Sequence, residues 1–233
     1  MNTSTYKIAL ITAIFGDLDD LKPVPEQSVP VDKFCFTNNH NIPAGEFRGW
    51  KVIHPDYPRY DLKNRIKAKY FRTLSHTVKE LQPYNIVIWL DGSIDIINPE
   101  FVAFMTNQVR TSGLVCFKHS VRNCIYEEAI VSKQGPKYTG EPIDEQIAQY
   151  RSEKYPERHG LIETGCFAKI INPETNKIME QWWHENIKYS YQDQISLPYV
   201  LWKNYYNPSI IDKNIHDNEY CFRPARSEEK EKI

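Results

Sequence analysis

The stretch Asn85-Ile-Val-Ile-Trp-Leu-Asp-Gly-Ser-Ile-Asp95 passes directly from an unbroken apolar run into a series of oxygen-bearing side chains. Residues 86–90 are apolar at every position, which is typical of a strand that is covered on both faces. Ligands of open α/β sheets bind at the carboxyl ends of such strands. If the chain stays extended, the two-residue period of a strand places Asp91, Ser93 and Asp95 on one face. The alternative is a turn at the strand end, because Asp-Gly is a common turn pair.

The segments around this strand alternate between two periodicities. Continuous apolar runs predict strands, and apolar residues spaced three to four apart predict helices. The predicted strands cover residues 6–15, 33–37, 50–54, 85–90, 114–118 and 160–170, and the predicted helices cover residues 62–81, 99–108, 124–132, 143–154, 172–189 and 193–202. This alternation predicts an α/β fold with a central mixed, mostly parallel sheet flanked by helices. We expect one domain over residues 1–226 and a charged, frayed tail over residues 227–233.

The composition excludes several classes of protein. The chain has 233 residues, of which 41% are hydrophobic and 25% are charged, as in ordinary globular domains. Its net charge of -1 argues against binding nucleic acid through bulk charge. No apolar stretch is long enough to span a membrane, and the apolar residues 8–15 read as a buried strand rather than a signal peptide. The odd number of five cysteines, without a CxxC pair, indicates buried thiols in a reducing compartment, so we expect a cytoplasmic protein.

The strand-end carboxylates are the strongest chemical signal. The sequence has no Walker loop, no Gly-x-Gly-x-x-Gly, no nucleophile-elbow serine and no His-Glu-x-x-His motif. Hard oxygen ligands at Asp91, Ser93 and Asp95 would suit Mg²⁺ or Mn²⁺ together with a diphosphate. A second signal is a basic helix face formed by Arg65, Lys69 and Arg72, which could assist the departure of a diphosphate. The alternative for these three is an ordinary solvated helix face.

Two motifs together resemble a known family. An apolar strand that ends in Asp-x-Asp is the mark of GT-A glycosyltransferases, and Trp89-Leu90-Asp91-Gly92-Ser93 resembles it with Ser93 at the second Asp position. The block from His119 through Arg122 to Tyr126-Glu127-Glu128 resembles that of a glycosyltransferase-like family which includes plant mucilage and pectin galacturonosyltransferases. The likeness covers residues 6–223. The chain is also similar in layout to family 8 glycosyltransferases and to small viral capsid glycosyltransferases.

The resemblance implies a metal-dependent transfer of a sugar from a nucleoside diphosphate sugar, with UDP-sugars favoured, to a glycan or glycoprotein hydroxyl. It also leans towards retention of the anomeric configuration. The implied ligands of Mn²⁺ or Mg²⁺ are Asp91, Ser93, Asp95 and His216. The implied catalytic residues are Asp193, Gln194 and Glu163. The residues expected to bind the donor or other substrate are Thr12, Ala13, Phe15, Asn38, Arg65, Lys69, Asp91, Gly92, Ser93, His119, Arg122, Glu128, Thr164 and Gly165.

Several of these residues have a structural alternative. His119, Arg122 and Glu128 could form an internal ion-pair network instead of binding a ligand. His216 could be a surface or capping residue, and Asp193 could simply cap the helix that follows it.

Two other functions remain open from the sequence. A sugar-nucleotide pyrophosphorylase would need a basic, Gly-rich first loop, whereas residues 15–20 here are Phe-Gly-Asp-Leu-Asp-Asp and would repel a triphosphate. A non-catalytic carbohydrate-binding module would have little use for buried strand-end carboxylates, which are costly without a partner.

Overall fold

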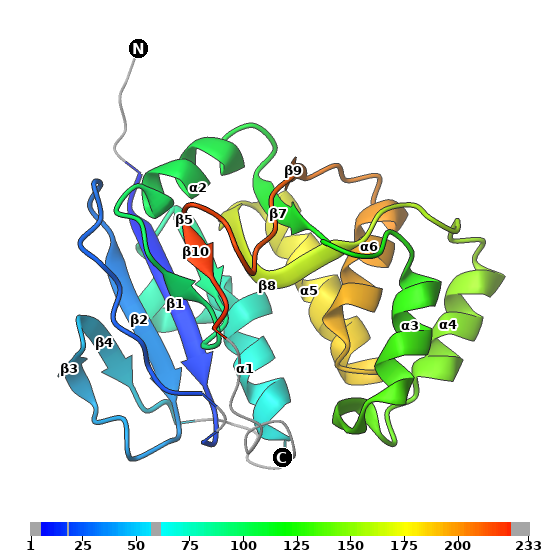
Figure 1. Ribbon diagram of the computed structural model, residues 1–233, viewed down its shortest axis with the longest axis horizontal. Helices are drawn as coiled ribbons and strands as arrows, with labels where there is room; N and C mark the ends of the chain where they lie inside the picture. Colours follow the sequence, from blue (N-terminus) through cyan, green and yellow to red (C-terminus); the bar gives the residue numbers. More distant parts are fainter. Residues whose placement is uncertain (1–5, 18, 57–61, 225–233) are drawn as a thin grey trace.

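The computed structural model describes residues 6–17, 19–56 and 62–224. Within them the chain forms one eight-stranded sheet in the order β3-β4-β2-β1-β5-β8-β7-β9, with helices on both faces (Figure 1). The strands are β1 (Ile8–Ile14), β2 (Asp32–Thr37), β3 (Gly45–Phe47), β4 (Trp50–Ile53), β5 (Ile86–Leu90), β7 (Leu114–Lys118), β8 (Ile162–Ile170) and β9 (Ser209–Ile211). A separate antiparallel pair joins β6 (Asp95–Ile96) to β10 (Cys221–Phe222).

Strands β4, β2, β1 and β5 form a parallel block, and β3 adds to it at the edge, antiparallel to β4. Strand β1 pairs in parallel with both β2 and β5, and β2 pairs in parallel with β4. Every residue of β1 and of β5 is buried, as their continuous apolar sequences predict. Their carboxyl ends therefore lie at the same edge of the sheet, where Asp91 follows β5.

The second half is mixed and contains an irregularity. Strand β8 runs antiparallel to both β5 and β7. Cys116 of β7 is paired with Phe167, but the next residue, Phe117, is paired with Glu163. Three residues of β8, from Thr164 to Cys166, are therefore not paired with any residue of β7. Such bulges re-aim side chains, and this one lies beside the end of β5.

Helices cover the two faces of the sheet. They are α1 (Asn64–Thr73), α2 (Phe101–Val109), α3 (Ile125–Gln134), α4 (Ile143–Ser152), α5 (Pro173–Lys188) and α6 (Asp193–Lys203). Helix α2 contributes to the core that contains Leu10 and Ile88, whereas the other five helices contribute to the core that contains Ile11 and Trp89. The division follows the alternation of side chains along each strand. The described part of the chain confirms the predicted α/β class and the GT-A-like arrangement.

The long helix predicted over residues 62–81 is wrong in its second half. Helix α1 ends at Thr73, and two short 3-10 helices follow, η1 (Ser75–Thr77) and η2 (Lys79–Leu81). The Thr77 hydroxyl donates to the Leu74 carbonyl at 2.8 Å, and Val78 has an extended backbone. Hydroxyl side chains that bond the backbone in this way compete with the helical ladder.

Of the two conformations that the sequence left open after Asp91, the structure contains the turn. The Ile94 N–H donates to the Asp91 carbonyl at 3.0 Å, so the chain turns at Asp-Gly. Four short strands, β3, β6, β9 and β10, were not predicted, and residues 136–138 of an expected loop form a 3-10 helix. Helix α2 begins at Phe101 rather than 99, and the Asn98 side chain accepts a hydrogen bond from the Glu100 N–H at 2.8 Å just before it.

Other expectations are confirmed. The helix predicted over residues 172–189 is present as α5, and Asn172 caps it in a capping box with Thr175. Residues 8–14 form a buried strand, and all five cysteines are free and buried. No helix among the described residues is long and apolar enough to cross a membrane. The predicted tail, residues 227–233, lies outside the described residues.

Candidate active site

A polar cavity of about 280 Å³ opens at the carboxyl ends of β1 and β5. Its walls come from these strand ends, from α1, from the irregular part of β8 and from the start of α6. The charged residues that line it are Asp19, Arg65, Lys69, Arg72, Asp91, Lys137, Glu163, Asp193 and Arg223. This edge of the sheet is where open α/β sheets bind their ligands.

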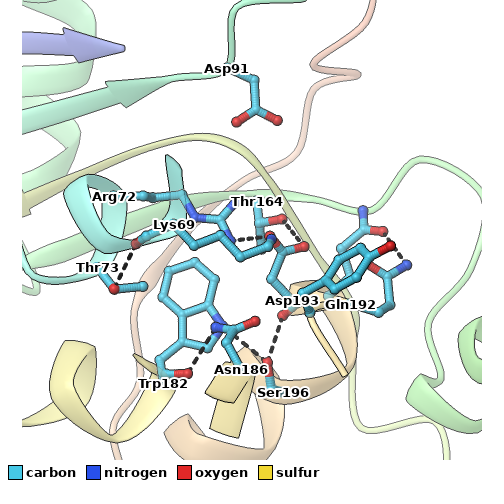
Figure 2. Close-up of polar contacts among 12 residues, drawn as sticks. Lys69, Arg72, Thr73, Asp91, Thr164, Trp182, Asn186, Gln192, Asp193 and Ser196 are labelled. Carbon is cyan, nitrogen blue, oxygen red and sulfur yellow. Dashed lines mark hydrogen bonds and ion pairs between the residues drawn. The ribbon is translucent and has the colours of Figure 1, made fainter. Parts of the chain in front are cut away.

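Asp193 anchors one wall of the cavity. One carboxylate oxygen, Oδ2, accepts from both Lys69 and Arg72 of α1, and the other accepts from the Thr164 hydroxyl at 3.0 Å (Figure 2). Burial alone would raise the pKa of Asp193, but Arg72 and Lys69 outweigh it and hold that pKa far below its usual range. Asp193 makes no side-chain capping bond to α6, so it does not serve as the cap that the sequence left open. Its role here is to hold two buried cations in place.

The Arg72 guanidinium is fixed from several sides. Arg72 is 3% exposed and lies 4.7 Å from the Trp182 ring and 5.8 Å from the Trp89 ring, measured between Cζ and the ring centroids. A buried guanidinium between aromatic faces and a carboxylate is held by cation–π attraction and by charge-assisted hydrogen bonds. The predicted basic face of α1 is therefore partly buried and points into the site rather than into solvent.

Asp91 lies on the opposite side of the cavity, apart from this cluster (Figure 2). Its Oδ1 accepts from the Trp89 indole N–H at 2.8 Å, and its backbone N–H donates to the Gly165 carbonyl at 2.7 Å. A side chain at position 165 would place its Cβ 3.4 Å from Asp91 Oδ2 and 3.0 Å from Ile94, so the glycine gives the carboxylate room. Desolvation raises the pKa of Asp91, and the nearby Asp193 adds to this, although Arg72 and Lys69 oppose it.

Three of the four residues expected to hold a metal line the same cavity, and the fourth does not. Asp91, Ser93 and His216 line the cavity, but Asp95 lies in β6 and pairs with Lys22 at 2.8 Å. Nε2 of His216 lies 3.6 Å from Glu163 Oε1. Among the described residues, no group of three or more His, Cys, Asp or Glu side chains is arranged to hold a metal ion. These residues do not fit a metal centre built by the protein alone, and we route no step through one.

Glu163 is the carboxylate of the cavity that faces two imidazoles. Its Oε2 accepts from the Gln194 amide at 2.6 Å, and its Oε1 lies 3.6 Å from Nε2 of both His119 and His216. Nδ1 of His119 accepts from the backbone N–H groups of Val121 and Arg122, so the proton of the neutral ring is assigned to Nε2, which faces Glu163. Burial lowers the pKa of His119, against the opposing effect of Glu163. With this arrangement the Glu163 carboxylate can accept a proton from a bound substrate, next to two imidazoles.

His119, Arg122 and Glu128 lie behind the cavity and do not line it. Arg122 donates to Glu128 at 2.6 Å, and Glu128 accepts from the Gln192 amide at 2.8 Å. The internal network that the sequence left as an alternative is therefore what the structure contains. Through Gln192, at the start of α6, and through His119, the network supports the positions of Asp193 and Glu163.

The remaining predicted residues divide into two groups. Those that line the cavity are Ala13, Phe15, Arg65, Lys69, Gly92, Thr164, Gly165 and Gln194. Thr12 and Asn38 do not line it. Thr12 is buried in β1, and the Asn38 side chain accepts from the Gly16 N–H at 2.8 Å, which shapes the loop after β1.

The sequence analysis missed two cations that line the cavity. Lys137 belongs to η3 (Pro136–Tyr138), in a segment predicted as a loop, and Arg223 follows β10. The Arg223 N–H donates to the His216 carbonyl at 2.9 Å, which ties the C-terminal segment to the site. Neither residue belongs to a local pattern that could have indicated its position, because both reach the site only through the tertiary fold.

A larger cavity, of about 570 Å³, lies at the other end of α6. It is lined mainly by apolar and aromatic side chains such as Tyr155, Trp202 and Tyr205, and it contains no carboxylate among the residues described. Its size alone does not make it a reaction site. The smaller cavity contains the acids and bases that chemistry on a charged substrate requires.

The strand-end site and the sheet order define an α/β domain of the glycosyltransferase type. The chain matches the TOD1/MUCI70, glycosyltransferase-like domain family over residues 1–220, and it therefore belongs to that family. A search of curated proteins found no match. The family supports a glycosyltransferase, which acts between a sugar donor and an acceptor.

Proposed function

We propose that the protein transfers a glycosyl group from a nucleoside diphosphate sugar, with UDP-sugars favoured, to a hydroxyl of a glycan or glycoprotein. The observation that carries this proposal is the cavity at the ends of β1 and β5, where the Asp91 carboxylate lies opposite a group of cations. A donor of this class has a diphosphate for the cations and hydroxyl groups for the carboxylate. The family membership supports the same class of reaction.

The cationic wall would stabilise the leaving group. As the bond between the anomeric carbon and the diphosphate breaks, negative charge accumulates on the diphosphate oxygens. Fixed positive charges beside a leaving group lower the barrier most when they are preorganised and partly shielded from water. Arg72 meets these conditions, because Asp193 and two indole rings hold it in place, and Lys69, whose pKa is lowered to about 7 by burial, shares the same carboxylate.

Glu163 is the best candidate for proton transfer at the acceptor. Its carboxylate faces the cavity and is oriented by Gln194. A base must come within hydrogen-bond reach of the acceptor hydroxyl. Glu163 is the cavity carboxylate that lies close to two imidazoles, those of His119 and His216, whose protonation can change with the charge of Glu163. A base at the acceptor serves an inverting, single-displacement route, whereas the retention that the family resemblance favours would need the hydroxyl to attack from the face that the diphosphate leaves, with a diphosphate oxygen accepting its proton. The anomeric proton signals of donor and product in NMR spectra would distinguish the two routes.

The experiment is a donor screen. Release of nucleoside diphosphate from a panel of UDP- and GDP-sugars is measured with and without Mn²⁺, for the wild type and for Asp91→Asn and Glu163→Gln. We expect turnover with at least one donor, and at least 100-fold lower turnover in both variants. Asp144→Asn, which changes an exposed carboxylate on α4, is the matched control and should retain wild-type turnover.

Two outcomes would replace the proposal. Formation of nucleoside triphosphate when pyrophosphate is added to a sugar nucleotide would identify a pyrophosphorylase. Binding of sugars without release of nucleotide from any donor would identify a non-catalytic module.

A further inference from the structure

Three cations that line the cavity have no carboxylate partner in the part of the chain that the structure describes. They are Arg65 of α1, Lys137 of η3 and Arg223 after β10. Lys69 and Arg72, in contrast, share the Asp193 carboxylate. The cavity therefore has an inner pair of cations that share one carboxylate and, among the described residues, an outer group of three that form no ion pair.

These three cations influence one another. Partial desolvation lowers the pKa of Lys137, and Arg65 and Arg223 lower it further against the opposing effects of Asp193 and Asp91. The three cations come from three separate segments, and both arginines repel the charge of Lys137. An anion of at least two charges, bound between them, removes this repulsion.

The size and chemistry of the cavity restrict the anion. Its volume of about 280 Å³ suits a small phosphate group and part of a nucleoside, but not a polymer. Arginine binds phosphate oxygens with two parallel hydrogen bonds, and lysine binds them as a point charge. A diphosphate presents enough oxygens for two arginines and one lysine together.

We infer that Arg65, Lys137 and Arg223 clamp the diphosphate of the donor, and that nucleotide binding therefore persists without a divalent cation. This inference rests on the proposed function, and it concerns how the same site neutralises the leaving group. It agrees with the geometry on the other side of the cavity, where Asp95 is turned away from Asp91 and pairs with Lys22.

The test is calorimetric titration with pyrophosphate and with UDP, in EDTA and in Mn²⁺. Both probes should bind the wild type in EDTA. Arg65→Met, Lys137→Met and Arg223→Met should each weaken binding about tenfold, and the triple variant should abolish it. All three side chains are at least partly exposed, so the melting temperatures of the variants should stay close to that of the wild type. Lys133→Met, which removes a cation paired with Asp144 on the surface, is the control and should bind as the wild type does.

Each outcome of the titrations either supports or overturns the inference. Binding that requires Mn²⁺, or variants that bind within twofold of the wild type in EDTA, would overturn the inference. The donor screen separates this failure from failure of the proposed function. Sugar transfer combined with strictly Mn²⁺-dependent UDP binding would keep the function and remove the clamp. UDP binding in EDTA without transfer from any donor would keep the clamp and remove the function.

Discussion

The two carboxylates on opposite sides of the cavity, Asp193 and Asp91, lie in contrasting surroundings. Asp193 accepts hydrogen bonds from three side chains, two of them cationic, and its pKa is held far below the usual range. Asp91 accepts from one side chain, the Trp89 indole, and desolvation raises its pKa. The first carboxylate is satisfied by the fold, and the second is left partly unsatisfied.

This difference distinguishes a carboxylate that stabilises the fold, Asp193, from a carboxylate that is available to a ligand, Asp91. A buried ion pair whose partners are complete contributes to a fixed geometry, and loss of one partner is costly. A carboxylate that the fold leaves desolvated and under-bonded lowers stability, and such groups are typical of ligand sites. We therefore expect loss of the Asp193 carboxylate to lower the stability of the fold, and loss of the Asp91 carboxylate to weaken binding of the donor.

Asp193→Ala should have the largest effect on stability. The substitution leaves Lys69 and the buried Arg72 without their carboxylate, and breaking a buried pair in this way costs about 3–5 kcal/mol. Urea denaturation followed by circular dichroism would measure the loss. Asp144→Ala, at an exposed ion pair, is the control and should change stability by less than about 1 kcal/mol. A loss of equal size in both variants would show that the Asp193 cluster is not a stabilising unit.

Lys169, a buried cation beneath the end of α1, allows a second test of stability through pH. Its side chain is fully buried in β8 and donates to the Thr73 carbonyl at the end of α1, at 2.8 Å. Burial lowers its pKa to about 7 from 10.5, partly offset by Glu180. Between these values the unfolded chain binds the proton and the folded chain does not, so stability should rise with pH.

The corresponding variant is Lys169→Met. From pH 7 to pH 9 the wild type should gain about 1–3 kcal/mol relative to this variant. Urea denaturation at both pH values would measure the difference. Lys177→Met, at an exposed position on α5, should follow the wild type at both values. A constant difference between the wild type and Lys169→Met across this range would contradict the buried, deprotonated lysine.

Asp91→Asn should change stability little, and in the opposite direction from Asp193→Ala. The amide keeps the acceptor for Trp89 and removes a charge whose pKa is raised, so a gain of up to about 1 kcal/mol at pH 7 is expected. The gain should disappear as the pH falls through the raised pKa, because the wild-type carboxyl is then neutral too. Melting temperatures at pH 7 and pH 4 would test this. A destabilisation as large as that of Asp193→Ala would mean that the two carboxylates are equivalent.

Asp95→Ala should have the smallest effect. It removes one partly exposed ion pair with Lys22, which contributes about 0.2–1 kcal/mol. Donor turnover should stay within twofold of the wild type, because Asp95 does not line the cavity. A loss of turnover comparable to that of Asp91→Asn would restore Asp95 to the site.

The sequence predicted those parts of the site that depend on local order. Asp91 was predicted because it ends a buried strand, and Lys69 because it shares a helix face with its neighbours. The position of Asp95 was wrong, since the Asp-Gly pair turned the chain. No local pattern could place Lys137 or Arg223, because their approach to the cavity depends on how η3 and the segment after β10 pack on the domain.

Prediction of the fold was limited in the same way, to elements that have a clear local pattern. The long, strongly apolar strands and the capped helix α5 were predicted from the sequence. Strands of two or three residues, such as β6 and β10, contain too few side chains to show a period. The break at Thr73 depended on hydroxyl groups that bond the backbone, which a count of apolar positions does not include.

A crystal structure of the protein with UDP bound would test directly whether the cavity at the ends of β1 and β5 binds the diphosphate of the donor. We expect the diphosphate in the cavity of about 280 Å³, in contact with Arg65, Lys137 and Arg223, with the rest of the nucleotide towards Asp91 and the end of β1. A nucleotide bound in the larger aromatic cavity at the other end of α6, or a diphosphate remote from all three cations, would contradict it.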